Sequence, residues 1–350
     1  MSIIKKHILA MSAYKPPLDG RNPKVHMLLD FNERTIPVSD ALVKALNDYI
    51  ADGRLQQYPA YGDIVQRLSR YAGVKPEQLM ITNGSDQGID LVFRAVVKSD
   101  AEAIIPAPSF AMYTQCAKVE AMKLIEPVYT KANGYPLQGV LDSITPNTAI
   151  IVVSNPNNPC GTIVSEEVIT QIANAAPHAA ILVDECYYEY SRKTIVASLA
   201  DLPNLFITRT FSKTWGIPSL RFGYLMAAPE YIRALCNIRG PYDINQLAIV
   251  AAEAALDNPD YTERYVKEVM QAAKPLLEKW LAQNNIDFWP SSANYIWVFP
   301  KNAELVNQYL SENGVLVRPK PYAGEMGLRI TVGTLEQTQK LIDLLNESAK

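Results

Sequence analysis

The sequence predicts an α/β protein in which a mostly parallel sheet is flanked by helices. Short apolar runs alternate with helical patterns in the middle of the chain. The runs are continuous rather than alternating, as expected of strands that are buried on both faces. They cover residues 79–81, 103–105, 149–153, 181–183, 205–207 and 222–226. Helical stretches such as 87–97 and 166–176 separate several of them, and this order is typical of a largely parallel sheet.

The two ends of the chain differ from this central part. Residues up to about 37 are rich in proline and polar residues and are predicted to form an arm. A helix is then expected from Val38 to about Asp52, with Ser39 as its cap. The end of the chain predicts a smaller α+β domain. Its expected elements are helices over 261–283, 303–313 and 335–348 and strands over 295–299, 315–318 and 328–332.

These patterns divide the chain into two parts. We expect a large domain over residues 38–255, and an N-terminal arm with a small C-terminal domain over 1–37 and 256–350. A length of 350 residues is comfortable for two hydrophobic cores.

Composition excludes several classes of function. The formal net charge is −3 and no long basic run occurs, so no nucleic-acid partner is expected. No stretch approaches the roughly 20 apolar residues that cross a bilayer, and the apolar stretch after Lys6 is too short for a signal peptide. We therefore expect no membrane contact and a cytoplasmic location.

The cysteines and histidines predict neither a metal site nor a disulfide framework. The four cysteines lie far apart and include no CxxC pair, and the three histidines are scattered. These residues are Cys116, Cys160, Cys186, Cys236, His7, His26 and His178. If the chain is an enzyme, its chemistry must come from other side chains.

Polar residues gather where the predicted strands end, which is the edge of an open α/β sheet where ligands bind. Gly84, Ser85 and Asp86 follow the strand near 79–82 and open a helix, where free backbone N–H groups can hold an anion. Asn158 lies in a turn rich in Asn, Pro and Gly after the run 149–153. Each pattern also occurs in ordinary caps and turns.

The next two strands end in reactive side chains. Asp184 and Tyr187 follow the run 181–183, and an acid at the end of a buried strand is costly without a partner. The run 205–207 leads to Thr210, Ser212 and Lys213. Taken singly, Lys213 could be a solvated lysine and Asp184 a structural ion pair.

Together these residues describe one chemistry. A carboxylate suits a cationic ring nitrogen, hydrogen-bond donors suit a phenolic oxygen, and an amine suits an aldehyde; Asp184, Asn158, Tyr187 and Lys213 offer these groups. A phosphate needs N–H groups, hydroxyls and an arginine. The chain can supply them from Gly84, Ser85, Thr210, Ser212 and Arg221.

The segment TFSKTWGIPSLRFGY resembles the lysine motif of the class I and II aminotransferases of fold type I, including the arginine eight residues after the lysine. NNPCG resembles that family's Asn-Pro-x-Gly turn, and DECY resembles its Asp-x-x-Tyr motif. Further segments occur in the family's order and are most similar to the histidinol-phosphate aminotransferases. They are QQYP, NGSDQGIDLVFRAV, PSFAMY, PYDIN, NYIWVF and GLRITVGT.

The resemblance implies a fold type I transferase whose cofactor is pyridoxal 5'-phosphate. Lys213 would bind the cofactor covalently, and Asp184 would keep its pyridine nitrogen protonated. Asn158 and Tyr187 would hydrogen-bond the ring oxygen, and Phe110 would stack on the ring. The phosphate would be bound by Gly84, Ser85, Asp86, Thr210, Ser212 and Arg221.

The resemblance also implies how substrates and subunits meet. Arg329 would bind an anionic end of the substrate, with Arg318 and Tyr14 nearby. Tyr58 would reach the phosphate of the partner subunit in a homodimer. The implied activity moves an amino group from histidinol phosphate or an aromatic amino acid to 2-oxoglutarate by a ping-pong mechanism.

Two segments depart from the family's pattern. Arg34-Thr35 stands where relatives often have Asn-Pro, and Lys320-Pro321-Tyr322 is unusual before the last arginine. Both lie where relatives contact substrate, so the donor and acceptor stay open.

Two other functions are compatible with the motifs. A lyase such as a threonine-phosphate decarboxylase would use the same cofactor, since the fold does not fix the reaction. A regulatory cofactor-binding protein is the other alternative, but no DNA-binding extension is present in the sequence.

Overall fold

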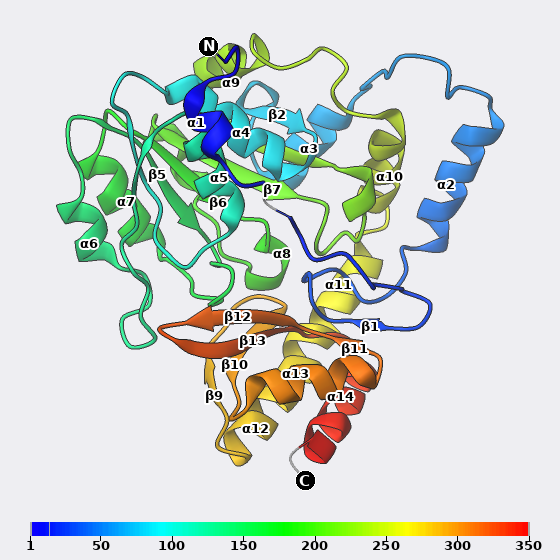
Figure 1. Ribbon diagram of the computed structural model, residues 1–350. Coiled ribbons are helices and arrows are strands. Elements are labelled where there is room, and N and C mark those ends of the chain that lie inside the picture. Colours follow the sequence, from blue (N-terminus) through cyan, green and yellow to red (C-terminus); the bar gives the residue numbers. More distant parts are fainter. Residues whose placement is uncertain (1, 14, 349–350) are drawn as a thin grey trace.

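The computed structural model describes residues 2–13 and 15–348, and its central feature is a seven-stranded sheet (Figure 1). The strand order is β2-β8-β7-β6-β5-β3-β4. β8 runs in the direction opposite to the other six strands, so the predicted mostly parallel sheet is confirmed. The strands are β2 (Leu79–Thr82), β3 (Glu102–Ile104), β4 (Lys123–Ile125), β5 (Thr148–Ser154), β6 (Ala180–Asp184), β7 (Leu205–Thr210) and β8 (Gly223–Ala227).

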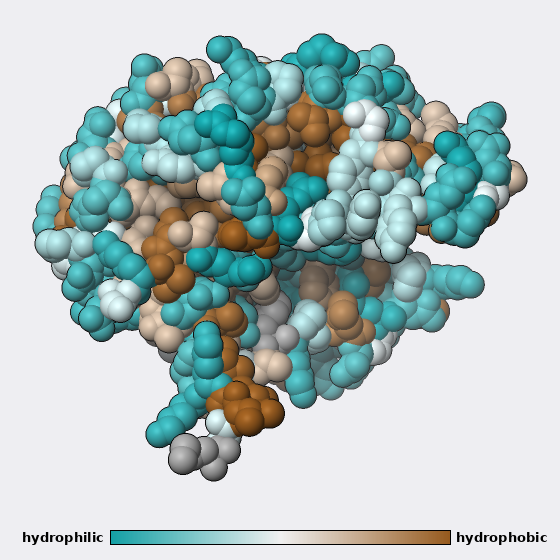
Figure 2. Space-filling view, turned by 90° about the horizontal axis from the view of Figure 1, so that it is seen from above, coloured by the Kyte–Doolittle hydropathy of each residue, from teal (hydrophilic) through white to brown (hydrophobic). Residues whose placement is uncertain are grey.

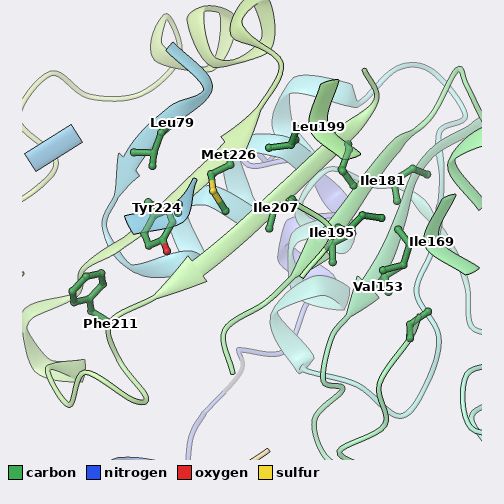
Figure 3. Packing of buried hydrophobic residues seen from close by; sticks show 14 of the residues in the cluster. Leu79, Val153, Ile169, Ile181, Ile195, Leu199, Ile207, Phe211, Tyr224 and Met226 are labelled. Carbon is green, nitrogen blue, oxygen red and sulfur yellow. The ribbon is translucent and has the colours of Figure 1, made fainter. Parts of the chain in front are cut away.

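Both faces of this sheet are covered by helices. Successive residues of β5 point to opposite faces, so Ile151 and Val153 join one core and Ile150 and Val152 another. Figure 3 shows the first core, to which Val153, Ile181 and Ile207 of three adjacent strands and Ile169 of α7 contribute. Helices α3 (Ile64–Ala72), α7 (Glu166–Ala175) and α10 (Gln246–Leu256) cover that face, and α4 (Gly84–Val96), α5 (Ala111–Val119) and α9 (Pro229–Cys236) cover the other.

Shorter elements connect or flank the large sheet. Ser39 caps α2 as predicted, because its hydroxyl accepts a hydrogen bond from the backbone N–H of Leu42. In Figure 1 α2 lies at the side of the large sheet, next to α10. The elements are α1 (Lys6–Ala10), α2 (Asp40–Ala51), α6 (Leu137–Asp142), α8 (Tyr188–Ser191) and the 3-10 turns η1 (Pro76–Gln78), η2 (Val196–Ala200) and η3 (Pro218–Leu220).

The end of the chain forms a smaller antiparallel sheet with helices against it. Its strand order is β12-β13-β10-β9. The long helix expected over 261–283 is interrupted by a π-helical turn. The elements are α11 (Pro259–Glu268), η4 (Val269–Ala273), α12 (Lys274–Gln283), β9 (Asp287–Trp289), β10 (Tyr295–Phe299), α13 (Ala303–Glu312), β11 (Val315–Leu316), β12 (Arg318–Tyr322), β13 (Glu325–Thr331) and α14 (Leu335–Ser348). No helix of the described chain is both long and apolar enough to span a membrane.

The N-terminal arm joins the small sheet to the edge of the large one. Its strand β1 (Met27–Leu28) pairs in parallel with β11. Beyond β1, Leu29 accepts a hydrogen bond from the backbone of Thr331. The large sheet lies within residues 38–255 and the small sheet within 256–350, while the boundaries themselves remain a prediction.

Candidate active site

A cavity opens at the carboxyl ends of β5, β6 and β7, where the polar residues were expected to meet. At about 110 Å³ it is smaller than another hollow of about 310 Å³ beside Lys98 and His178, so chemistry rather than size identifies it. Its lining comprises Ser85, Asp86, Phe110, Tyr113, Ser154, Asn158, Asp184, Cys186, Tyr187, Thr210, Ser212, Lys213 and Arg221.

One end of the cavity is built to hold an anion. Arg221 donates from Nη2 to Asp86 at 2.9 Å, and its Nη1 lies 3.3 Å from the Ser212 hydroxyl. The Thr210 hydroxyl donates to Ser212 at 3.0 Å. Hydroxyls, a guanidinium and the first turn of α4 therefore converge, and this combination suits phosphate.

Two glycines allow this end to close. Gly84 has a φ of 69°, and a Cβ built on it would lie 2.5 Å from Nη2 of Arg221. Gly223 passes so close to the start of α4 that its Cβ would lie 2.7 Å from the backbone nitrogen of Ser85. Gly84 and Gly223 therefore stand where only glycine, which has no Cβ, fits without a clash.

The cavity is also lined by a buried carboxylate. Asp184 is 1% exposed and accepts hydrogen bonds from the hydroxyls of Tyr113, at 2.6 Å, and Thr208, at 2.9 Å. Burial raises the pKa of Asp184 to about 6, although both hydrogen bonds act in the other direction. No described basic side chain forms an ion pair with it.

Lys213 lines the same cavity. Its amine donates to the backbone carbonyl of Phe31 at 2.8 Å, which brings the N-terminal arm into the site. Burial lowers the pKa of Lys213 below its ordinary value, and the positive charge of Arg329 acts in the same direction. The fold therefore favours the neutral, nucleophilic form of this amine.

Asn158 and Tyr187 each keep one hydrogen-bond donor available. The Asn158 Oδ1 accepts from Nη1 of Arg329 at 2.5 Å, and this leaves its Nδ2 to donate. The Tyr187 hydroxyl accepts from Nδ2 of Asn32 at 2.9 Å and retains its own proton. Phe110 lines the same cavity and meets Tyr113 edge-on at 5.6 Å between ring centroids.

The two expected substrate arginines lie together beside the cavity. Arg329 is 5% exposed, and its Nη2 donates to the carbonyl of Asp30 at 2.5 Å. The Arg318 guanidinium lies 4.2 Å from the ring centroid of Phe31. Tyr14, the third residue expected there, lies outside the described residues.

Tyr58 lies apart from its own chain's cavity. It is 78% exposed in the segment between α2 and α3 and stacks on Tyr242 at 4.5 Å. This exposure is compatible with a contact to a second subunit.

Sequence reasoning missed several residues of the site. Tyr113 and Thr208 donate hydrogen bonds to Asp184. From the arm, Phe31 accepts a hydrogen bond from Lys213, and Asn32 donates one to Tyr187. Tyr113 lay within the quoted segment PSFAMY, but only the folded chain reveals its contact with a carboxylate 71 positions away. Asn32 lies two positions before the unusual Arg34-Thr35, and no motif in the sequence gives it a role.

A buried network behind the lysine was also not predicted. Glu189 of α8 is 4% exposed and accepts hydrogen bonds from Thr214 and from Nε1 of Trp215, the two residues after Lys213. It therefore ties the lysine segment to the helix that follows Tyr187.

Comparison with known proteins agrees with this architecture. The family model for aminotransferases of class I and II matches residues 25–345. The chain is 32% identical to a histidinol-phosphate aminotransferase of Geobacillus sp. strain WCH70, over 89% of this chain and 86% of that protein.

Two solved structures share the fold. One is the histidinol-phosphate aminotransferase of Sinorhizobium meliloti in complex with pyridoxal-5'-phosphate, with a TM-score of 0.88 and 23% identity over 99% of this chain and 98% of that one. The other is the L-threonine-O-3-phosphate decarboxylase of Porphyromonas gingivalis, with a TM-score of 0.78 and 22% identity over 92% of this chain and 98% of that one.

Proposed function

Because the chain belongs to the class I and II aminotransferases and is a pyridoxal-phosphate-dependent aminotransferase, we propose that it transfers an amino group from histidinol phosphate to 2-oxoglutarate. An aromatic amino acid is the alternative donor. The observation that carries the proposal is the meeting of Lys213, Asp184 and Arg221 in one cavity. We place the reaction in the cytoplasm.

The cavity residues fit the cofactor. Asp184 is a buried carboxylate that receives only neutral hydroxyl donors from the described side chains, so a cationic ring nitrogen would complete its environment. Arg221, Ser212, Thr210, Ser85 and the turn at Gly84 suit the phosphate group, with Asp86 orienting the arginine. Phe110 offers an aromatic face for the ring.

When bound, pyridoxal phosphate supplies an aldehyde that bonds to amines and a ring that accepts electrons from the α-carbon of the substrate. Lys213 would be the residue that holds the cofactor covalently, through its side-chain amine. The lowered pKa of Lys213 shifts its amine towards the neutral form, which would act as the base that removes the α-proton of the substrate.

The remaining residues orient the reactants. Asn158 and Tyr187 each have a donor available for the ring oxygen, because Arg329 and Asn32 occupy their acceptor positions. We assign Arg329 to the anionic end common to both substrates. Arg318 and Tyr14 would add affinity for a phosphate.

A single site then serves two substrates in turn, and this leads to ping-pong kinetics. A guanidinium suits a site that binds two substrates, because the geometry of its planar donors matches both carboxylate and phosphate. Arg329→Ala is therefore expected to impair both half-reactions, and Arg318→Ala to impair a phosphorylated donor more than phenylalanine.

We further propose a homodimer in which Tyr58 completes the phosphate site of the neighbouring subunit. Its support is a set of exposed apolar side chains on α2, on the segment that follows it, and at Tyr242, which stacks on Tyr58. Val43, Ile50, Leu55, Tyr58 and Tyr242 are each more than 40% exposed. Figure 2, which views the molecule from above, shows brown hydrophobic patches among the hydrophilic residues of that face. Such surfaces are typical of interfaces.

A donor panel tests the proposed reaction. The cofactor-loaded protein is mixed with 2-oxoglutarate and histidinol phosphate, phenylalanine, tyrosine or aspartate, and glutamate formation is followed. We expect the highest kcat/KM with histidinol phosphate. A protein that is active on other donors but ignores histidinol phosphate would refute this choice of donor.

Product analysis separates transamination from the lyase alternative. Release of carbon dioxide from threonine phosphate without a keto product would identify a decarboxylase. We expect a keto product and stoichiometric glutamate, because transamination conserves the amino nitrogen.

A further inference from the structure

Three cationic side chains share one face of the small sheet. In β12 and β13, Arg318 stands directly opposite Arg329, and Lys320 stands opposite Gly327. Directly paired residues project to the same face, and so do residues two positions apart on one strand. Arg318, Lys320 and Arg329 therefore project side by side.

This face is turned towards the large domain. Trp297 of β10 pairs with Arg329 and belongs to the core beneath the large sheet, as does the neighbouring Trp289. In β12, Arg318, Lys320 and Tyr322 are half-buried, whereas Pro319 and Pro321 between them are exposed. Figure 1 shows β12 and β13 as the layer of the small domain next to the large one.

The backbone of Lys320 is fixed against this core. Its carbonyl accepts a hydrogen bond from Nε1 of Trp297 at 3.1 Å. The indole fills the space over Gly327, where a Cβ would lie 2.6 Å from the same nitrogen. Packing against Trp297 therefore fixes the backbone of Lys320.

The group of cations begins at the cavity. Arg329 contacts Asn158, which lines the cavity together with Lys213. Arg318 lies next to it and approaches the carbonyl of Asp30. Lys320 is the third member of the group and lies two residues after Arg318 on β12.

The arrangement is electrostatically costly as it stands. Burial, together with the positive charges of Arg329 and Arg318, lowers the pKa of Lys320 to about 8. Lys320 forms no ion pair with any acidic side chain in the described part of the chain. Repulsion of this kind beside a cavity indicates a site for an anion.

We propose that Lys320 is a substrate-specificity residue which, with Arg318 and Arg329, binds a phosphate monoester at the end of the amino donor remote from the reacting amine. This inference rests on the proposed function and adds a residue to it. A phosphate carries roughly two negative charges and three acceptor oxygens, whereas one guanidinium already matches a carboxylate. A third cation is therefore better suited to phosphate.

The test compares Lys320→Met, which keeps the length of the side chain and removes its charge, with Lys320→Arg, which keeps the charge. Lys279→Met is the matched control, because Lys279 is exposed on α12 of the same domain. The donor half-reaction of the cofactor-loaded enzymes is measured with histidinol phosphate and with phenylalanine, and thermal unfolding checks that each variant folds.

We expect Lys320→Met to lose about 10- to 100-fold in kcat/KM on histidinol phosphate, the effect of one lost charge-assisted hydrogen bond. Phenylalanine should change less than about threefold, and Lys320→Arg should retain most activity on both donors. Equal losses on both donors, or no loss on histidinol phosphate, would overturn the inference. A comparable loss on glutamate would mean that Lys320 binds a carboxylate, and this too would overturn it.

A second measurement separates this inference from the proposed function. If the wild type does not use histidinol phosphate, the proposed donor is wrong, and inorganic phosphate is then tested as a competitive inhibitor of phenylalanine transamination. A phosphate inhibition constant about tenfold weaker in Lys320→Met than in Lys279→Met supports the phosphate site. Equal constants in the two variants contradict it.

Discussion

Among single residues, Asp184 shows most directly how the fold prepares the site. The end of β6 places this carboxylate in the interior, where burial opposes its ionisation. Tyr113 and Thr208 supply hydrogen bonds but no positive charge. A cationic ligand in the cavity would therefore interact with Asp184 strongly, since screening by water is weak there.

Asp184 should make the stability of the cofactor-free protein depend on pH. The pKa of Asp184 is about 6 in the folded chain, whereas its ordinary value is 3.8. At pH values between these two, the folded state therefore binds more protons than the unfolded state. The free energy of unfolding should fall as the pH rises from about 4 to above 6, by about 3 kcal/mol from this residue. Denaturant titrations of the wild type and Asp184→Asn measure the contribution as the difference between the two curves.

Asp19→Asn serves as the control for that measurement, because Asp19 is exposed in the arm. Its curve should parallel the wild type. A curve for Asp184→Asn that also parallels the wild type over this pH range would show that Asp184 ionises normally in the folded chain.

The sequence could predict the residues whose role follows from a local motif. Asp184 ends β6, and Lys213 and Asn158 follow the ends of β7 and β5, so strand order alone brings these residues to one edge. The contacts of Phe31 and Asn32 could not be predicted in this way. They join positions 182 and 155 residues apart, and only the path of the arm between the two sheets determines them.

Among the structural elements, the first turn of α4 carries the tightest steric requirement. Gly84 adopts a left-handed backbone conformation, and the Arg221 guanidinium lies over the place of its missing side chain. Arg221 itself also has a positive φ, of 56°. The anion-binding end therefore depends on two unusual backbone conformations that face each other.

Gly84→Ala should weaken the binding of pyridoxal phosphate by about tenfold or more, because the new methyl group displaces Arg221 and its charge-assisted hydrogen bonds. Gly73→Ala is the matched control: Gly73 has a φ of 73° at the end of α3, and a Cβ there meets nothing within 4 Å. Both variants should lose about 1 kcal/mol of stability from backbone strain. Titration with the cofactor measures the affinity, and similar affinities in the two variants would argue against the steric account.

Elements with strong apolar periodicity were predictable, whereas short edge strands were not. β4 has three residues and begins with an exposed lysine, so its pattern is too short to recognise. β12 contains Pro319 and Pro321, which normally argue against a strand. It forms because it lies at the edge of the small sheet, where alternate N–H groups need no partner strand.

At the scale of the whole molecule, the proposed dimer would create two composite sites. Tyr58 is the residue that joins the subunits in this account, since it is exposed and belongs to an apolar surface. A C2 dimer uses the same patch on both subunits, so each subunit would donate its Tyr58 and receive the other.

Complementation between two impaired variants tests this arrangement. Lys213→Ala and Tyr58→Ala are co-expressed with different tags, and activity is measured at a cofactor concentration that does not saturate Tyr58→Ala. If Tyr58 acts across the interface, hybrids contain one intact site, and the mixture should regain about a quarter of wild-type activity. Activity no higher than the average of the two variants would show that Tyr58 acts within its own subunit or not at all.

The covalent attachment of the cofactor to Lys213 is the central claim, and it can be measured directly. Borohydride reduces the cofactor–lysine linkage to a stable amine, and mass spectrometry of the proteolytic peptides then locates the modified residue. The account predicts the adduct on Lys213, whose amine lies in the cavity with Asp184 and Arg221. Lys320 is the internal comparison, because its pKa is lowered as well, to about 8. An adduct on Lys320 or on any lysine other than Lys213 would contradict the account.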